Sequence, residues 1–312
     1  MSVDLCGLWV PIITPFTAVD AVDLESLAQL GARLLDDGAT GLVVLGTTGE
    51  PATLGGRERR RVVEACAAVC RERDRPFIVG AGTNSTRGTI DEVTTWAADV
   101  PDAAALLLVV PYYTRPSEAG IVAHYRAVAA ASALPIVAYN IPYRTGRGLG
   151  AGALLELAEI PNVVGVKQAV GALERDTLAV LRARPAAFHV LAGDDAYIGP
   201  LALMGGSGAI AASAHLRTGE FAALVAAGLE GDVATVRRLA GDLLATVDAG
   251  FGEPSPAVFK AALAVLGEIA APAVRAPLVE ASAEATAALL ATLPQSAYAT
   301  GSSSNAASST GG

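Results

Sequence analysis

Lys167 is the residue of this sequence most suited to nucleophilic chemistry. Of the 22 lysines and arginines only Lys167 and Lys260 are lysines, so a purely surface cation would almost always be an arginine. Lys167 ends the apolar run 163–166, where burial would disfavour the charged amine and lower its pKa. A neutral amine can condense with a ketone to an imine and so make an enamine accessible. The structural alternative pairs Lys167 with Asp194 or Asp195 to plug the core, and spacing favours neither interpretation.

Tyr139 ends another apolar run and is a candidate proton relay for such a condensation. The ordinary pKa of tyrosine is near 10, so it needs hydroxyl neighbours to move protons at neutral pH. Thr47 and Tyr113 are the candidate neighbours. Taken alone, each of the three residues fits core packing or a capped turn better than catalysis.

Eight short apolar runs alternate with longer amphipathic stretches, and this alternation must position those side chains. The runs are nearly continuously apolar, as expected of parallel strands covered on both faces. We predict strands at 8–14, 41–45, 77–80, 104–110, 136–139, 163–167, 188–192 and 208–212. The pattern predicts a (β/α)8 TIM barrel. The rival doubly wound open sheet would favour a glycine fingerprint, but residues 46–50 lack both the dinucleotide-binding spacing and the lysine of a phosphate loop.

In such a barrel the active site lies at the carboxyl ends of the strands. Residues at those ends include Thr48, Gly193 and Ile210. Arg144 lies just beyond the fifth strand, in a predicted loop, and its planar fork suits a carboxylate. A solvent-exposed ion pair is the plainer interpretation of Arg144. The predicted site therefore gathers at one end of the barrel.

The domain organisation follows from the same pattern. We predict a barrel over 1–228, a helical C-terminal domain over 229–294 and a disordered tail over 295–312, where the composition turns to Ser, Ala, Asn, Gly and Thr. The C-terminal helices are expected at 219–229, 233–247, 256–266 and 280–293.

Composition narrows the class of ligand. A net charge of −9 argues against nucleic acid or an anionic membrane as partner. No apolar run approaches the roughly 20 residues of a membrane span, and no secretory signal is visible, so we expect a cytoplasmic protein. The three cysteines, Cys6, Cys66 and Cys70, are interpreted as buried thiols rather than as a metal or redox site.

Together the motifs resemble the dihydrodipicolinate synthase and N-acetylneuraminate lyase family from Gly7 to about Leu293. The matching segments are 7–11 with 14–16, 46–50, 111–113 with 115–116, 139–142, 165–167, 193–195, and 253–256 with Lys260. Their order and spacing make chance agreement very improbable.

The resemblance implies a role for each candidate. Lys167 would form the Schiff base with pyruvate, and Tyr139 would be the proton donor and acceptor, linked through Thr47 to a Tyr113 supplied by a neighbouring subunit. Thr48 would bind the pyruvate carboxylate, with backbone near Ile210 and the Gly193 segment also contacting substrate. The family is commonly a homotetramer built as a dimer of dimers.

Thr47-Thr48 and the sequence Arg144-Thr145-Gly146 resemble the synthase branch, in which this arginine binds the carboxylate of aspartate semialdehyde. The implied activity is that of a lyase condensing pyruvate with L-aspartate 4-semialdehyde to 4-hydroxy-tetrahydrodipicolinate, towards diaminopimelate and lysine. No metal or organic cofactor is expected, because the lysine is itself the electron sink.

Several positions depart from the family pattern. Pro51, Gly56, Arg59 and Gly88 replace residues of the lysine feedback site found in regulated members, so we predict little inhibition by lysine. Gln168 and Tyr143 also differ from many relatives and could reshape the aldehyde pocket.

These departures keep two alternatives open. One is a related pyruvate-dependent aldolase or hydratase-lyase that acts on another aldehyde or keto acid. The other is a non-catalytic barrel that binds metabolites, although a binding module has no need of a desolvated amine beside a proton relay. Lys260 is interpreted as structural, from its place near the end of a C-terminal helix.

Overall fold

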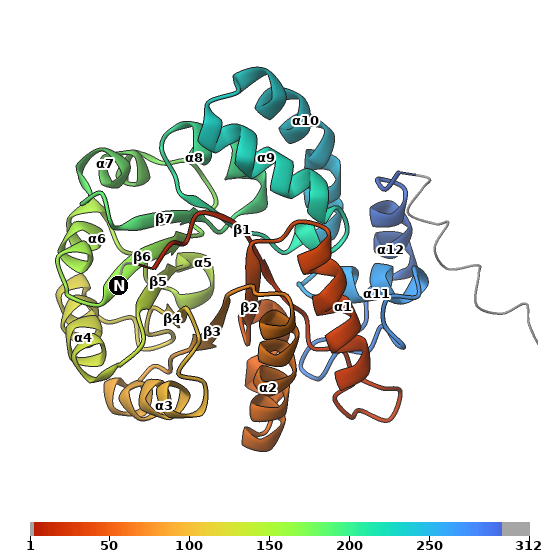
Figure 1. The fold of residues 1–312 in the computed structure, drawn as a ribbon, viewed down its shortest axis with the longest axis horizontal. Helices are drawn as coiled ribbons and strands as arrows, with labels where there is room; N and C mark the ends of the chain where they lie inside the picture. The colour runs from red at the N-terminus through yellow and green to blue at the C-terminus, as the bar shows by residue number, and fades with distance from the viewer. Residues whose placement is uncertain (1–2, 295–312) are drawn as a thin grey trace, which may run out of the picture.

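A computed structural model describes residues 3–294 and confirms the barrel. Eight parallel strands close in the order β1 to β8 (Figure 1). They are β1 Gly7–Pro11, β2 Gly41–Val44, β3 Phe77–Ala81, β4 Ala105–Val109, β5 Ile136–Asn140, β6 Val163–Gln168, β7 His189–Ala192 and β8 Gly208–Ile210. The sequence predicted all eight strands.

The largest differences from prediction are at the ends of β1 and β8, which stop at Pro11 and Ile210 rather than at 14 and 212. Beyond β1, the Ile13 N–H donates to Nε2 of the buried His215, 3.1 Å away, instead of to a neighbouring strand. The His215 Nδ1–H in turn donates to the Ala212 carbonyl at 2.7 Å. One neutral imidazole therefore replaces the strand pairing between these two segments.

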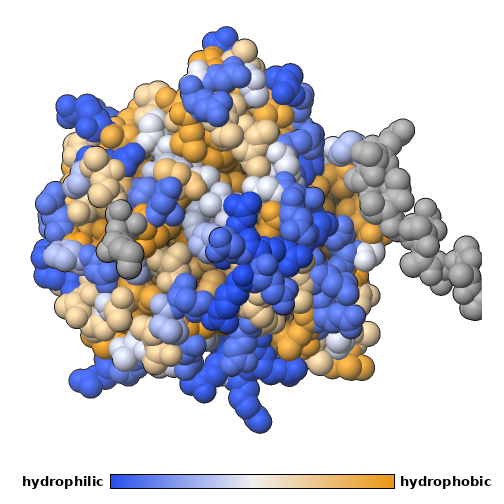
Figure 2. Space-filling model, viewed as in Figure 1, coloured by the Kyte–Doolittle hydropathy of each residue, from blue (hydrophilic) through white to orange (hydrophobic). Residues whose placement is uncertain are grey.

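Helices follow the strands and surround them (Figure 1). They are α1 Leu24–Asp36, α2 Gly56–Glu72, α3 Thr86–Asp99, α4 Glu118–Ala131, α5 Pro142–Thr145, α6 Ala151–Ala158, α7 Arg175–Ala183, α8 Ile198–Leu203, α9 Thr218–Glu230, α10 Val233–Gly250, α11 Ala257–Val265 and α12 Ala283–Leu290. Single 3-10 turns occur at Thr47–Gly49 (η1), Pro51–Thr53 (η2), Asp195–Tyr197 (η3) and Ser213–His215 (η4). Figure 2 shows hydrophilic side chains over the solvent faces of α1 and α2, as amphipathic helices require.

The four helices predicted at the C-terminal end are α9 to α12, each within a few residues of its predicted range. In Figure 1 α11 and α12 lie beside α1, and the Arg33–Glu268 ion pair, with a 2.9 Å N–O distance, joins α1 to the segment after α11. The predicted tail at 295–312 lies outside the described residues.

The apolar core has two main layers. The larger lies between the strands and the helices, and the smaller fills the barrel itself. At the amino end of the strands the Trp9 indole N–H donates to the Leu5 carbonyl at 3.0 Å, and both residues are fully buried. The interior is therefore filled from that end.

None of the helices in residues 3–294 combines the length and the apolar character that a membrane span requires.

Candidate functional site

A cavity of about 590 Å³ opens at the carboxyl ends of the strands. Its walls come from the barrel and from the segment that joins α10 to α11. Seven of the eight predicted site residues line this cavity, namely Thr47, Thr48, Tyr139, Arg144, Lys167, Gly193 and Ile210. The eighth, Tyr113, does not.

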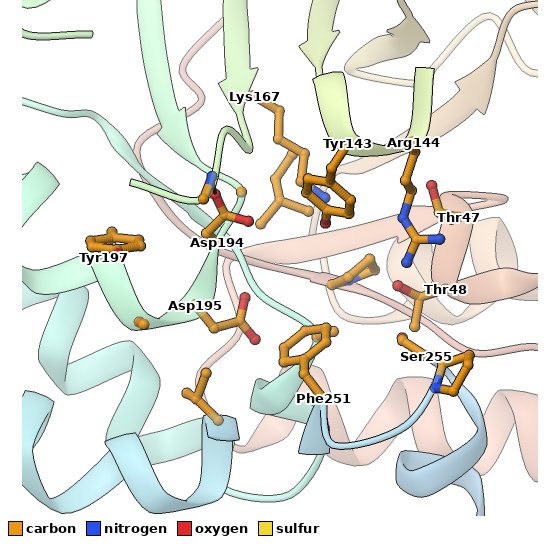
Figure 3. Close-up of a pocket in the computed structure, with 18 of the residues that line it drawn as sticks. Thr47, Thr48, Tyr143, Arg144, Lys167, Asp194, Asp195, Tyr197, Phe251 and Ser255 are labelled. Carbon is orange, nitrogen blue, oxygen red and sulfur yellow. Dashed lines mark hydrogen bonds between the residues drawn. The ribbon is translucent and has the colours of Figure 1, made fainter. Parts of the chain in front are cut away.

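Lys167 projects from β6 into this cavity (Figure 3). It is paired with Tyr139 in the register of β5 and β6, and its Nζ lies 4.4 Å from the centroid of the Tyr139 ring. Only 6% of Lys167 is exposed, and burial lowers the pKa of its amine to about 8. Within residues 3–294 no ion pair includes Lys167, so the structure lacks the pairing with Asp194 or Asp195 that the structural alternative requires.

Asp194 and Asp195 lie near enough to influence Lys167, and their negative charges oppose the loss of its proton. Burial raises the pKa of both carboxyl groups. Each is held by a backbone donor instead of a cation: the Gly171 N–H lies 2.6 Å from Asp194 Oδ2, and the Ser213 N–H lies 2.7 Å from Asp195 Oδ2. These contacts fix where the two charges act on the amine.

Gly193 makes room for the Lys167 side chain. A Cβ at Gly193 would lie 3.0 Å from both Cγ and Cε of Lys167 and 2.7 Å from the Cβ of Ala169. Such separations are shorter than van der Waals contact. A larger residue at position 193 would therefore force Ala169 or the Lys167 side chain to shift.

Tyr139 is 6% exposed, and burial raises the pKa of its phenol to about 12. The nearby Thr47 side chain opposes that rise, because its hydroxyl favours the charged phenolate. Thr47 and Thr48 both lie on the 3-10 turn η1, where Thr48 is buried and Thr47 is exposed. Tyr113 is 86% exposed with φ +69°, and its backbone N–H donates to the Thr145 carbonyl. Within the single chain, Tyr139 and Thr47 thus line the same cavity, whereas Tyr113 lies outside it.

Arg144 lies on the one-turn helix α5 and not in a loop as predicted. Pro142 at the first position of α5 and the left-handed Gly146 after it explain the turn. Figure 3 shows the Arg144 side chain directed towards Thr47 and Thr48, across the cavity from Asp194. Its guanidinium carbon lies 5.6 Å from the centroid of the Tyr143 ring, which forms part of the same wall.

No role was predicted from the sequence for the residues of the wall that the C-terminal helices supply. Phe251, Glu253 and Ser255, from the segment between α10 and α11, line the cavity. The motif at 253–256 was the available signal, but no spacing along the chain reveals that it returns to the strand ends.

Gln168 does not shape the cavity. Its amide accepts from the Asn140 Nδ2 at 3.0 Å and donates to the Thr177 hydroxyl at 3.0 Å, behind the barrel wall. Because successive side chains of a strand point to opposite faces, Lys167 faces inwards and Gln168 outwards.

Cys66 and Cys70 are buried as predicted, but Cys6, which precedes β1 at the amino end of the barrel, is exposed. There Asp4, Cys6 and His189 bring possible metal-binding atoms within 4.8 Å of one another, at the end opposite the cavity. The Cys6 N–H already donates to Asp4 Oδ1 at 2.9 Å.

Comparison with known proteins shows which family this chain resembles. The model of the dihydrodipicolinate synthetase family matches residues 4–296. The 4-hydroxy-tetrahydrodipicolinate synthase of Moorella thermoacetica is 43% identical over 273 residues, covering 88% of this chain and 92% of that protein. The synthase of Salinibacter ruber is 42% identical over 276 residues, covering 87% and 89%.

Solved structures agree. Dihydrodipicolinate synthase from Thermotoga maritima superposes with a TM-score of 0.88 at 32% identity, covering 93% of this chain and 97% of that one. The chloride-inhibited synthase from Acinetobacter baumannii, complexed with pyruvate, gives 0.88 at 34% identity, covering 92% and 97%.

Proposed function

The chain belongs to the dihydrodipicolinate synthetase family, and we infer that it is a lyase condensing pyruvate with L-aspartate 4-semialdehyde to 4-hydroxy-tetrahydrodipicolinate. The main support for this inference is the position of Lys167. Its amine is buried, has no ion-pair partner in residues 3–294, and extends into the cavity beside the ring of Tyr139. This activity serves diaminopimelate and lysine biosynthesis.

The chemistry begins with the neutral amine of Lys167 attacking the keto carbon of pyruvate. Loss of water from the carbinolamine forms the imine, and loss of a methyl proton gives the enamine. The enamine carbon then attacks the aldehyde carbon of the second substrate, and the new alkoxide takes up a proton. The amino group of that substrate displaces Lys167 from the imine carbon, which closes the ring and frees the lysine.

Tyr139 is assigned the proton transfers at the carbinolamine and the alkoxide. Its raised pKa keeps the phenol protonated in the resting enzyme, so it begins as a donor, and Thr47 gives it a hydroxyl partner. Thr48, with the backbone near Ile210 and Gly193, would bind the pyruvate carboxylate and keto group from the cavity wall.

Arg144 is assigned to the carboxylate of the aldehyde substrate. It is exposed at the cavity wall, and a guanidinium can bind a carboxylate through two parallel hydrogen bonds. A different pyruvate-dependent aldolase would need a different partner for this cation, so Arg144 supports aspartate semialdehyde over a neutral aldehyde.

We also propose a cytoplasmic homotetramer, a dimer of dimers in which Tyr113 enters the site of a neighbouring subunit. Its exposure and left-handed backbone leave the ring projecting from the single chain. Sedimentation of the active protein tests the assembly, and an active species that sediments only as a monomer would refute it. Fractionation of the source cells tests the compartment.

The deciding experiment is incubation with pyruvate and borohydride, followed by mass analysis of peptides. Reduction should leave a pyruvate-derived adduct on Lys167, and addition of aspartate semialdehyde with a coupled reductase should show turnover. An adduct without turnover would redirect the search to other aldehydes. Absence of any adduct would refute the Schiff-base mechanism and leave a non-catalytic barrel.

A further inference from the structure

Lys260, the second lysine of the chain, lies in a fully buried ion pair with Glu50. Its Nζ is 2.5 Å from Glu50 Oε1, and the two side chains are 0% and 1% exposed. The same ammonium donates to the Ala273 carbonyl at 2.9 Å and lies 4.0 Å from the centroid of the Phe16 ring. Lys260 is thus enclosed in the interior, as a structural interpretation requires, but it is bound to a residue 210 positions away.

Glu50 is held at both carboxylate oxygens. Oε2 accepts from the Arg275 backbone N–H at 3.0 Å, while Oε1 accepts from Lys260. The backbone of Glu50 is left-handed, with φ +52°, a conformation that costs free energy for a residue with a Cβ. Two strong side-chain contacts therefore fix a residue whose backbone is unfavourable.

Such a pair contributes little net stability. Removing two charges from water costs about as much as their attraction returns, so apolar replacements of similar volume are often as stable. What a buried ion pair does provide is directional contact between two particular segments. The location of those segments therefore indicates its role.

One segment carries the threonines of the proposed site. Glu50 directly follows η1, which bears Thr47 and Thr48, and the Thr14 hydroxyl donates to the Gly49 carbonyl at 2.7 Å. The other segment is α11, whose preceding residues Pro254 and Ser255 line the same cavity. Figure 3 shows Thr48 and Ser255 near each other on that wall. The ion pair joins the two segments behind the surface that a substrate would touch.

We propose that Glu50 and Lys260 are positioning residues, which hold η1 against the Ser255 segment and so place the Thr47 and Thr48 hydroxyls for the reaction. This inference rests on the proposed function, because it acts through threonines assigned to substrate binding and proton transfer. Neither Glu50 nor Lys260 lines the cavity that holds Lys167, and both side chains are buried.

The test compares the double variant Glu50→Gln/Lys260→Met with wild type. The glutamine retains the shape of Glu50 and the methionine retains much of the lysine stem, so both charges leave together. We expect kcat/KM for pyruvate to fall about tenfold or more, because displacement of a binding group by about 1 Å can cost about 100-fold. The control is Arg71→Gln/Asp102→Asn, which removes an exposed ion pair between α2 and the segment before β4 and should leave kcat/KM unchanged.

A coupling experiment separates positioning from general destabilisation. In a Thr48→Ala background the double substitution should cause a smaller further loss of kcat/KM than it causes in wild type, since one of the two hydroxyls that it positions is already absent. Equal loss in both backgrounds, or a folded double variant with unchanged kcat/KM, would overturn the proposal.

Glu50→Asp provides a second route if the double variant does not fold. It keeps both charges but shortens the side chain by one methylene, so η1 must shift or the contact with Lys260 must lengthen. We expect a raised KM for pyruvate that again depends on Thr48, and an unchanged KM would count against positioning. Borohydride trapping of wild type is run in parallel, because absence of the Lys167 adduct there would refute the proposed function itself.

Discussion

The Lys167 amine faces the ring of Tyr139, with 4.4 Å between Nζ and the ring centroid, from adjacent strands in register. The amine therefore contacts the π face of the ring and not the phenol oxygen. The amine and the proposed proton donor are thus close to each other without an ion pair between them.

Replacing Tyr139 with phenylalanine should slow the proton transfers but leave Lys167 able to form the imine. The ring that packs against Lys167 remains, whereas the hydroxyl is lost. We expect kcat to fall about 10²–10⁴-fold, the usual contribution of a positioned proton donor. Steady-state kinetics measure the loss, and prolonged borohydride trapping should still label Lys167. Full activity in this variant would remove Tyr139 from the mechanism.

The rate should rise with pH through the pKa of Lys167. The attacking form is the neutral amine, and burial lowers its pKa to about 8, so protonation suppresses attack below that pH. We expect kcat/KM for pyruvate to increase about tenfold per pH unit below the pKa and to level off above it. A pH profile of kcat/KM measures this.

Asp195 provides a directed test of the same profile. Its charge raises the pKa of Lys167, so Asp195→Asn should move the plateau to lower pH, while the asparagine oxygen can still accept the Ser213 N–H. Asp102→Asn, on the exposed surface, is the matched control and should leave the profile in place. A shift to higher pH in the Asp195 variant would contradict the electrostatic argument.

Arg144→Lys should affect the second substrate alone. The positive charge remains, but an ammonium cannot form two parallel hydrogen bonds to a carboxylate. We expect the KM for aspartate semialdehyde to rise about tenfold, as for the loss of one charge-assisted hydrogen bond, with pyruvate trapping on Lys167 unchanged. If the KM for pyruvate rises instead, Arg144 binds the first substrate.

Gly193→Ala should displace the lysine. The added Cβ would lie 3.0 Å from Lys167 Cγ and Cε, so the side chain must move or the strand end must shift. We expect a lower rate of adduct formation and a loss of about 1–3 kcal/mol in the free energy of unfolding, as for other overpacked sites. Gly152→Ala, on α6 with no atom within 4 Å of the added Cβ, is the control and should not lower stability. An unchanged rate of adduct formation in the Gly193 variant would show that the site can accommodate the added methyl group.

Lysine at millimolar concentration should inhibit weakly. Arg59, at a position that the resemblance assigns to the lysine feedback site, forms an ion pair with Glu92. Its guanidinium carbon lies 5.8 Å from the centroid of the Trp96 ring, so its charge already has a partner. Initial rates with and without lysine decide the matter, with arginine as a control amino acid. Strong inhibition by lysine would contradict the prediction.

The fold was predictable from the sequence because its signals are local. Nearly continuous apolar runs such as 163–166 identify strands that are buried on both faces, and their alternation with helices leaves few topologies. The Lys167 prediction had the same kind of basis, since a rare lysine ends one of those runs. The sequence could not show that Cys6 is exposed, because that depends on how the segment before β1 packs against the rest of the barrel.

The sequence by itself therefore determined the barrel, its eight strands and the end at which Lys167, Tyr139 and Arg144 would gather, since strand direction brings those ends together. Only the tertiary structure decided that Gly193 makes room for the lysine, that Gln168 faces away, and that Glu50 pairs with Lys260 across 210 residues. Each of these depends on distances between segments far apart in the chain, which periodicity does not encode. The pKa of the Lys167 amine likewise depends on its burial and on the nearby charges of Asp194 and Asp195, which are set only when β6, β7 and their neighbours pack together.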